Sequence, residues 1–279
     1  IVLYKRVHEL ILLKNLIREQ NRILKYYDRV LRKEYQLPLS DEVERSVVRN
    51  LTNQFPKEAE REKYSDCVLI EKLENGDYRL SDSFNQDLQN PVFREMIQEL
   101  IDFGIDRYEE NYAQPYKDTN FQLYQKYTYE DVCRLLNWER NLNAQNIGGY
   151  YYDASTKTLP VFINYEKAED AIAYEDRFVS ENTLIALSKH PRKVTSMDAV
   201  HIYKVGECEK DNRIFLFVRK NKDDNEAKEF YFLGEIFAEG QPKAIHMDST
   251  NDDAFEILYR VDVSVRSEIY DYIVNSGEL

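Results

Sequence analysis

The sequence predicts an α+β protein in which a helical N-terminal region with a winged-helix-like unit is followed by a β-rich, barrel-like domain. Three observations predict this class. Up to about residue 112, apolar residues recur three or four positions apart, as on one face of a helix. Residues 113–120 contain Pro115 and mostly polar side chains, which indicates a linker. Beyond the linker, short apolar runs separated by polar turns are typical of a barrel or sandwich.

Composition and cysteine usage favour a folded intracellular protein. The 279 residues, 43% hydrophobic and 13% aromatic, are enough for two packed domains. The chain begins with Ile1 and shows no signal-peptide pattern, so we expect a piece of a larger protein. Charged residues interrupt every apolar run, and we expect no membrane span. Cys67, Cys133 and Cys208 lie far apart without a CxxC pair, which favours the reducing cytoplasm.

Charge is distributed unevenly along the chain. The formal net charge of −13 argues against nonspecific coating of nucleic acid. Residues 1–40 hold nine basic and four acidic residues, a net of 9 − 4 = +5, so the remainder carries −13 − 5 = −18. The basic residues are Lys5, Arg6, Lys14, Arg18, Arg22, Lys25, Arg29, Arg32 and Lys33. This basic arm predicts either a local contact with phosphate or an acidic partner, or a solvated face.

One long amphipathic helix is predicted over Val2 to Glu34, within a connector of residues 1–36. No Gly or Pro interrupts this stretch, and leucine or isoleucine recurs every seven residues from Leu3 to Leu31. Such a stripe can pair with another chain or pack against a neighbouring domain. The second interpretation is favoured, because the flanking positions are mostly basic rather than complementary in charge.

Residues 37–115 predict the winged-helix-like unit. A helix is expected over Asp41–Phe55, a short one after Pro56, and a long one from Pro91 to about Tyr112. Between them, residues 67–80 contain an Asn-Gly pair flanked by apolar runs, which predicts a β-hairpin. Such a unit can bind DNA or serve as scaffolding, and the acidic residues of this hairpin would repel phosphate.

Residues 120–279 predict the β-rich domain. Its first element is a short helix over Thr128–Trp138, because Thr128 and Asp131 have the spacing of a capping box. Turns are expected at residues 223–225 and 239–242. The expected strands are Gly149–Tyr152, Leu159–Tyr165, Ala199–Tyr203, Ile214–Arg219, Lys228–Phe237 and Phe255–Val265.

No catalytic or metal-binding residue is predicted. The sequence has no phosphate-binding loop, no GxSxG serine motif, and neither HxxxH nor the paired histidine-lysine spacing of phospholipase-D-type nucleases. A metal-dependent nuclease of the PD…(D/E)xK type needs an acid two residues before its lysine. That position before Lys167 is Tyr165, so only a degenerate nuclease stays open. We expect no cofactor in this chain.

A nucleic-acid groove is the favoured site in the β-rich domain. Aromatic faces can stack on bases while Lys and Arg contact phosphate, and both kinds of residue are interleaved here. The alternative is that the tyrosines are core and rim residues of a barrel. The predicted groove consists of Tyr150, Tyr152, Lys167, Arg177, His190, Arg192, Lys193, Arg219 and Lys220.

Residues 120–275 also carry a resemblance to a known family. An uncharacterised domain at the C-terminal end of bacterial DEAD/DEAH-type helicases is resembled by the segments Tyr127–Trp138, Asn146–Tyr150 and Leu159–Lys167, continued by Phe178–Ser180, Ser188–Lys189 and Glu229–Gly234. Those helicases often also carry a phospholipase-D-like nuclease domain. The resemblance therefore implies a role in restriction or defence against foreign DNA. ATP and Mg²⁺ would belong to the helicase core, whose motifs this sequence lacks.

These inferences together predict a non-catalytic accessory part of a helicase that contributes DNA recognition in the cytoplasm. Its expected partners are DNA, including modified or branched DNA, and the helicase core of the same polypeptide. By analogy, a PUA-like or SRA-like barrel would enclose a flipped base. A protein-interaction scaffold that positions the helicase and a degenerate metal-dependent nuclease are the alternatives.

Overall fold

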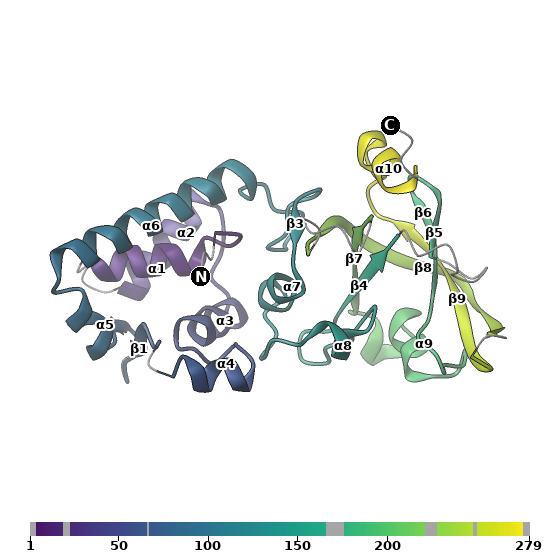
Figure 1. Cartoon of the computed structure of the whole chain (residues 1–279), viewed down its shortest axis with the longest axis horizontal. Coiled ribbons are helices and arrows are strands. Elements are labelled where there is room, and N and C mark those ends of the chain that lie inside the picture. Colours follow the sequence, from purple (N-terminus) through teal and green to yellow (C-terminus); the bar gives the residue numbers. More distant parts are fainter. Residues whose placement is uncertain are drawn as a thin grey trace. The chain divides into compact units, whose positions relative to one another are not determined.

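The computed structural model describes residues 4–18, 23–65, 67–165, 176–220, 228–247 and 250–275. It confirms the α+β class, with a helical N-terminal region and a β-rich C-terminal region (Figure 1). The chain divides into two compact units, 1–122 with 133–142 and 123–132 with 143–279. The helix at Tyr129–Leu135 supplies residues to both units. The boundaries predicted at residues 36, 115 and 120 stay predictions.

The helical unit is built around a buried central helix. Every residue of α1 except Lys14 is buried, and α1 packs against α2, α3, α6 and β2. Its elements are α1 (His8–Ile17), α2 (Ile23–Glu34), α3 (Asp41–Leu51), α4 (Glu58–Lys63), β1 (Ile70–Lys72), β2 (Tyr78–Leu80), α5 (Asp82–Asp87) and α6 (Pro91–Asn111).

Local signals position most of these elements as predicted. The side chains of Ser40 and Asn90 accept backbone hydrogen bonds at the starts of α3 and α6. β1 and β2 pair in an antiparallel hairpin, and Gly76 in its turn has a φ of 84°. The expected helix after Pro56 is α4.

The single helix predicted over Val2–Glu34 is wrong. Two helices occupy this stretch, and α1 and α2 pack side by side (Figure 1). A continuous helix of that length would extend for about 50 Å and leave its apolar stripe without a partner. Packing α1 and α2 against each other buries leucines and isoleucines of both helices.

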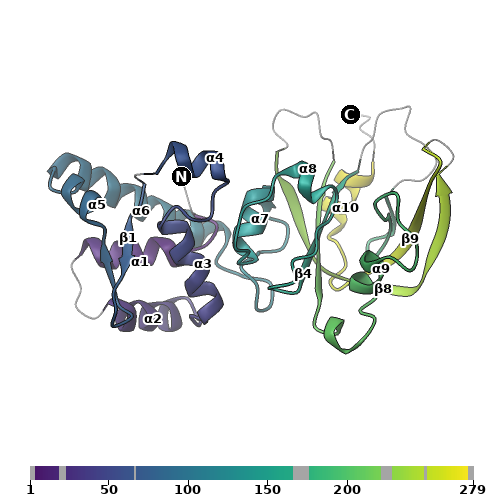
Figure 2. The ribbon, with the colours of Figure 1, turned by 90° about the horizontal axis from the view of Figure 1, so that it is seen from below.

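A seven-stranded sheet forms the β-rich unit and curls into a half-barrel (Figure 2). The strand order is β4-β7-β8-β9-β6-β5, and β3 pairs with β8. Among the described strand pairs of this sheet, β4–β7 is parallel and the others are antiparallel. The elements are β3 (Lys126–Tyr127), α7 (Tyr129–Leu135), α8 (Ala144–Ile147), β4 (Thr158–Asn164), β5 (Arg177–Ser180), β6 (Thr183–Leu187), α9 (Met197–Ile202), a 3-10 turn (Glu207–Glu209), β7 (Arg213–Arg219), β8 (Phe230–Met247), β9 (Asp252–Val261) and α10 (Ser267–Val274).

Both faces of the sheet are apolar. On one face, side chains such as Leu184, Leu216 and Phe255 are fully buried, and Ile273 of α10 joins this core. On the other face, Phe217 packs against Phe162, Phe232 and Tyr127, with ring centroids 5.2–6.4 Å apart. The curled sheet therefore encloses a packed core in its described residues.

Three local predictions in this unit are wrong. Residues 199–203 belong largely to α9 rather than to a strand, because Ala199 and Ile202, three residues apart, face the core. The turn expected at 239–242 is a register shift inside the long strand β8, where Gly240 has a φ of 68°. The strand expected at 149–152 contributes only an isolated bridge, from Tyr150 to Val161.

Candidate nucleic-acid interface

Tyr150 lies at the centre of one polar cluster from the predicted groove. Its hydroxyl donates to Asp198 Oδ2 at 2.6 Å and accepts from the Lys189 backbone N–H at 3.1 Å. Arg192 Nε donates to the same carboxylate oxygen at 2.8 Å, and Lys189 Nζ lies 4.9 Å from the centre of the Tyr150 ring. Burial and the bond to Asp198 raise the pKa of Tyr150, so this tyrosine remains a neutral structural group.

Acidic side chains lie beside three cations of the predicted groove and beside His190. Besides the Arg192–Asp198 contact, the distances are 3.9 Å for Arg177–Glu256, 4.0 Å for Lys193–Asp253 and 3.1 Å for His190–Asp252. A carboxylate within 4 Å offsets the attraction of a cation for phosphate. This part of the predicted groove is therefore electrostatically compensated.

Tyr152 belongs to a second cluster, formed around His201. The two rings stack with centroids 3.8 Å apart, and the Tyr152 hydroxyl donates to Asn212 Oδ1 at 2.9 Å. His201 Nδ1 lies 2.7 Å from Glu209 Oε2, and this bond lowers the pKa of Glu209. Tyr152 is thus engaged in holding the segment that leads into β7.

Two more residues of the predicted groove lie at the end of β7: Arg219 is its last residue and Lys220 follows it. Arg219 lies over the buried Phe230 ring at 4.4 Å, on the aromatic face of the sheet. Lys220 Nζ donates to the Asn275 carbonyl at 2.6 Å. Lys167 lies outside the described residues.

A second surface, at the α10 end of the sheet, combines aromatic rings with cations. Of its residues, the sequence analysis had singled out Lys220 alone. We call it the α10 rim; its members are Tyr124, Lys126, Lys220, Tyr231, Arg266 and Tyr272. Lys126 Nζ lies 4.9 Å from the Tyr231 ring centre, the Tyr231 and Tyr272 centroids are 6.0 Å apart, and Lys220 Nζ lies 5.4 Å from the Tyr272 ring centre.

The geometry of the sheet explains why these side chains meet. Lys126 and Val218 lie directly opposite Tyr231 on the neighbouring strands, and Lys220 follows Val218 by two residues. Arg266, just before α10, lies 4.5 Å from the Tyr124 ring centre. The rim therefore combines residues from five parts of the chain: the segment before β3, β3 itself, the end of β7, β8, and α10 with the residue before it. No short motif in the sequence could reveal this arrangement.

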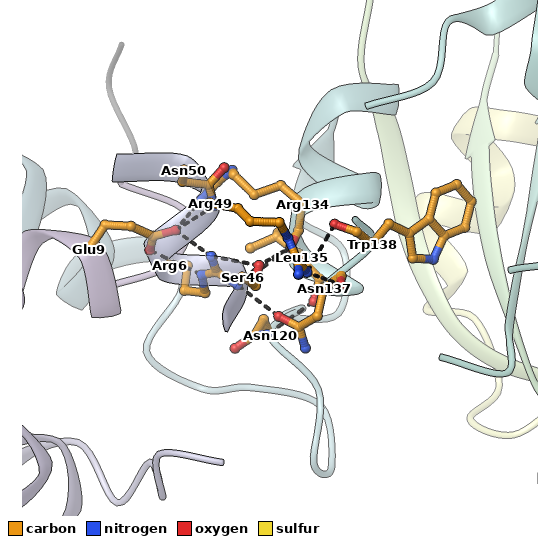
Figure 3. Close-up of polar contacts among 10 residues, drawn as sticks. All are labelled: Arg6, Glu9, Ser46, Arg49, Asn50, Asn120, Arg134, Leu135, Asn137 and Trp138. Carbon is orange, nitrogen blue, oxygen red and sulfur yellow. Dashed lines mark hydrogen bonds and ion pairs between the residues drawn. The ribbon is translucent and has the colours of Figure 1, made fainter. Parts of the chain in front are cut away.

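The helical unit contains a buried polar cluster that serves structure (Figure 3). Arg6 and Glu9, both about 1% exposed or less, form an ion pair, and Asn50 and Arg134 also contact Glu9. Arg6 Nη1 donates to Asn137 Oδ1 at 2.9 Å and to the Arg134 carbonyl at 3.4 Å.

This cluster caps the end of α7. Arg49 Nη2 donates to the Asn137 carbonyl at 2.9 Å, and Asn120 Nδ2 donates to the Leu135 carbonyl at 3.0 Å. The last carbonyls of a helix lack partners within the helix and carry partial negative charge, so guanidinium and amide donors stabilise them. The predicted basic arm is thus not a uniform surface, because Lys5 and Arg6 are buried.

The described residues contain no group of three or more His, Cys, Asp or Glu side chains placed to hold a metal ion. Asp153, which precedes β4, accepts hydrogen bonds from Ser155 Oγ, Thr156 Oγ1 and the Thr156 backbone N–H. This carboxylate organises a turn. Among the described helices, none is long and apolar enough to cross a membrane.

The fold and the rim define an α+β protein whose β-rich unit presents an aromatic and cationic surface. Residues 121–273 match the family described as Domain of unknown function (DUF3427), and the chain belongs to this family. Residues 1–113 match a second family, described as Domain of unknown function (DUF8090). A search of curated proteins found no match.

Proposed function

We propose that the β-rich unit is a non-catalytic DNA-recognition module that binds single-stranded DNA through the α10 rim. The observation that carries this proposal is the row Lys126–Tyr231–Tyr272–Lys220, in which two cations flank two neighbouring rings. Proteins that bind single strands combine stacking rings with cations that follow the backbone. The Tyr272 side chain is 47% exposed, so a base can reach its ring.

The packed interior favours recognition on the surface rather than inside the barrel. A flipped base needs an enclosed pocket, whereas the described interior positions hold apolar side chains that are almost fully buried. Unpaired bases, by contrast, stack on exposed rings without a pocket. Single-stranded DNA is therefore a better ligand for this surface than a base extruded from a duplex.

The resemblance of residues 120–275 to the C-terminal domain of DEAD/DEAH-type helicases supplies the biological setting of the proposal. A helicase produces single strands, and a module that holds one strand would assist it in restriction or in defence against foreign DNA. ATP and Mg²⁺ would act in the helicase core.

Binding of a fluorescent oligothymidylate, measured by anisotropy, tests the proposal. Tyr272→Ala removes the exposed stacking ring and should cost about 1–3 kcal/mol of binding free energy. The matched control is Tyr64→Ala, because Tyr64 is similarly exposed at 48% and lies 5.0 Å from Lys63 Nζ in the helical unit. The control should bind as the unmodified chain does.

The same assay separates the rim from the groove predicted from the sequence. Lys126→Gln with Arg266→Gln, two rim residues outside the predicted groove, should weaken binding. Arg192→Gln with Lys193→Gln should have little effect, because both cations already face carboxylates. If the Arg192→Gln, Lys193→Gln variant bound more weakly and the rim variant did not, DNA would bind at the predicted groove rather than at the rim. No measurable binding of single-stranded DNA by the unmodified chain would refute the proposed function.

A further inference from the structure

Helix α6 presents a continuous apolar stripe to solvent. Val92, Met96, Leu100 and Phe103 are spaced three or four residues apart, so they share one face of the helix. Their side chains are 63%, 60%, 45% and 55% exposed. The stripe extends for about 17 Å along the helix axis. Contiguous exposed apolar surface of this kind marks interaction sites.

The stripe is separate from the face by which α6 packs into its own unit. Ile101, Gly104, Ile105 and Tyr108 are the buried residues of α6, and Gly104 lies against Leu10 of α1. Since these residues already supply the packing face, folding of the helical unit does not account for the exposed stripe. The helix therefore carries a second apolar face, which its own unit leaves exposed.

One border of the stripe is acidic. Glu95, Glu99 and Asp106 are exposed, and their spacing of four and seven residues places them in a row beside the apolar residues. The exposed Arg107 near the C-terminal end of the stripe lies 3.4 Å from Glu110 and is compensated by it. A partner that covers the stripe would thus meet a line of negative charge along one edge.

We propose that this face of α6 docks an amphipathic helix of a protein partner, one whose apolar stripe is bordered by Lys or Arg. Helix-in-groove recognition uses apolar anchors with the same spacing as these four residues. Charge complementarity along the acidic row would fix the orientation of the docked helix. This inference concerns the helical unit and is independent of DNA binding at the α10 rim.

Two other occupants fit the charges less well. An antiparallel two-fold pair of α6 helices would align the acidic row of one copy with that of the other, and like charges at this range repel. Anionic lipid surfaces attract basic rather than acidic amphipathic helices.

A display selection tests the occupant. The unmodified chain is used to select from a library of helical peptides with a fixed leucine stripe, in which the flanking positions vary among Lys, Arg, Glu and Gln. We expect enrichment of Lys and Arg on one flank. Selected peptides should bind the Met96→Asp, Phe103→Asp variant at least tenfold more weakly than the unmodified chain. The control variant Val205→Asp, in which an exposed apolar residue elsewhere is changed, should bind them with the same affinity as the unmodified chain.

A charge-reversal variant sharpens the test. With Glu95→Lys, Glu99→Lys and Asp106→Lys together, the selection should switch to Glu-flanked peptides. Enrichment without a basic bias, no enrichment, or equal binding to the Met96→Asp, Phe103→Asp variant would overturn the proposal. The proposal would also be overturned if the unmodified chain associated with itself, or bound to anionic phosphatidylserine vesicles, and the Met96→Asp, Phe103→Asp variant did not. Circular dichroism of each variant confirms that the helices remain folded.

Discussion

The ion pair between Arg6 and Glu9 shows how a single buried charge depends on its surroundings. Burial alone would raise the pKa of the Glu9 carboxyl, but the Arg6 guanidinium and Arg134 lower it to about 2. Removing one partner of such a pair leaves an uncompensated buried charge, which is strongly destabilising. The neighbouring His8 is buried beside the same guanidinium, and burial and this charge lower its pKa as well.

His8 should make the stability of the protein depend on pH. Burial, helped by Arg6, lowers the pKa of His8 from 6.5 to about 3. Below pH 6.5 the unfolded chain therefore binds a proton at His8 that the folded chain does not. Stability is complete above this value and is lost as the pH falls toward 3. Lowering the pH to about 5 should cost about 2 kcal/mol from this residue.

Urea denaturation near neutral pH and near pH 5 measures this effect. The His8→Leu variant lacks the titrating group, so its free energy of unfolding should fall about 2 kcal/mol less than that of the unmodified chain. Glu9 does not interfere, because its unfolded pKa of 4.5 lies below this range. An identical loss in both proteins would show that His8 is not buried in the neutral form.

At the scale of residues, local signals were predictable and distant ones were not. The Asn-Gly hairpin turn, the start of a helix at Pro91 and the Thr128–Asp131 capping box depend on residues close together in sequence, and each was predicted correctly. The Arg6 cluster instead joins residues 40 to 131 positions apart. A sequence pattern cannot show that Arg6 is buried.

Helix α6 illustrates what decides packing between elements. A Cβ atom added at Gly104 would lie 3.0 Å from Leu10 Cδ1, so the absence of a side chain lets α6 approach α1 closely. The periodicity of α6 predicted a helix, but it does not show that Leu100, one of the apolar residues of this helix, is 45% exposed. Periodicity alone cannot rank two apolar faces of one helix.

Gly104→Val should destabilise the helical unit. The branched side chain must displace the buried Leu10 or push α6 away from α1, and overpacking of this kind costs about 1–3 kcal/mol. Thermal or urea unfolding measures the change. Val92→Ala, in the first turn of the same helix but 63% exposed, is the control and should change stability by less than about 0.5 kcal/mol. Equal effects would mean that α6 is not packed on α1 through Gly104.

Tertiary context also overrode strand propensity. Residues 199–203 contain a valine, an isoleucine and a tyrosine, which favour strands, but burial of Ala199 and Ile202 selects a helical turn. β5 and β6, which the sequence analysis missed, lie at one edge of the sheet and are held through pairing of β6 with β9. Long-range pairing of this kind is not encoded in a local pattern.

At the scale of the whole molecule, the proposed DNA-binding surface would have to act on a chain with a net charge of −13. The α10 rim and the predicted groove both draw residues from several elements, and only the three-dimensional arrangement distinguishes their electrostatics. Carboxylates lie beside three cations of the groove and beside His190. The rim cations lie over aromatic rings, and Lys220 also donates to the Asn275 carbonyl.

This balance predicts a shallow dependence of DNA binding on salt. The rim supplies three cations, Lys126, Lys220 and Arg266, and each phosphate neutralised on a single strand contributes about −0.7 to the slope of log affinity against log salt concentration. The slope should therefore be no steeper than about −2. Salt also screens repulsion between DNA and the acidic body, which makes the slope shallower still.

Anisotropy titrations of oligothymidylate at several sodium chloride concentrations measure this slope. Lys220→Gln should make it shallower by about 0.7, whereas Tyr272→Ala should lower the affinity and leave the slope nearly unchanged, because a ring releases no counterions. A slope of about −5 or steeper would require more phosphate contacts than the rim can make. The exposed cations of α2, including Lys25, Arg29 and Arg32, would then be the better candidates for the DNA-binding surface.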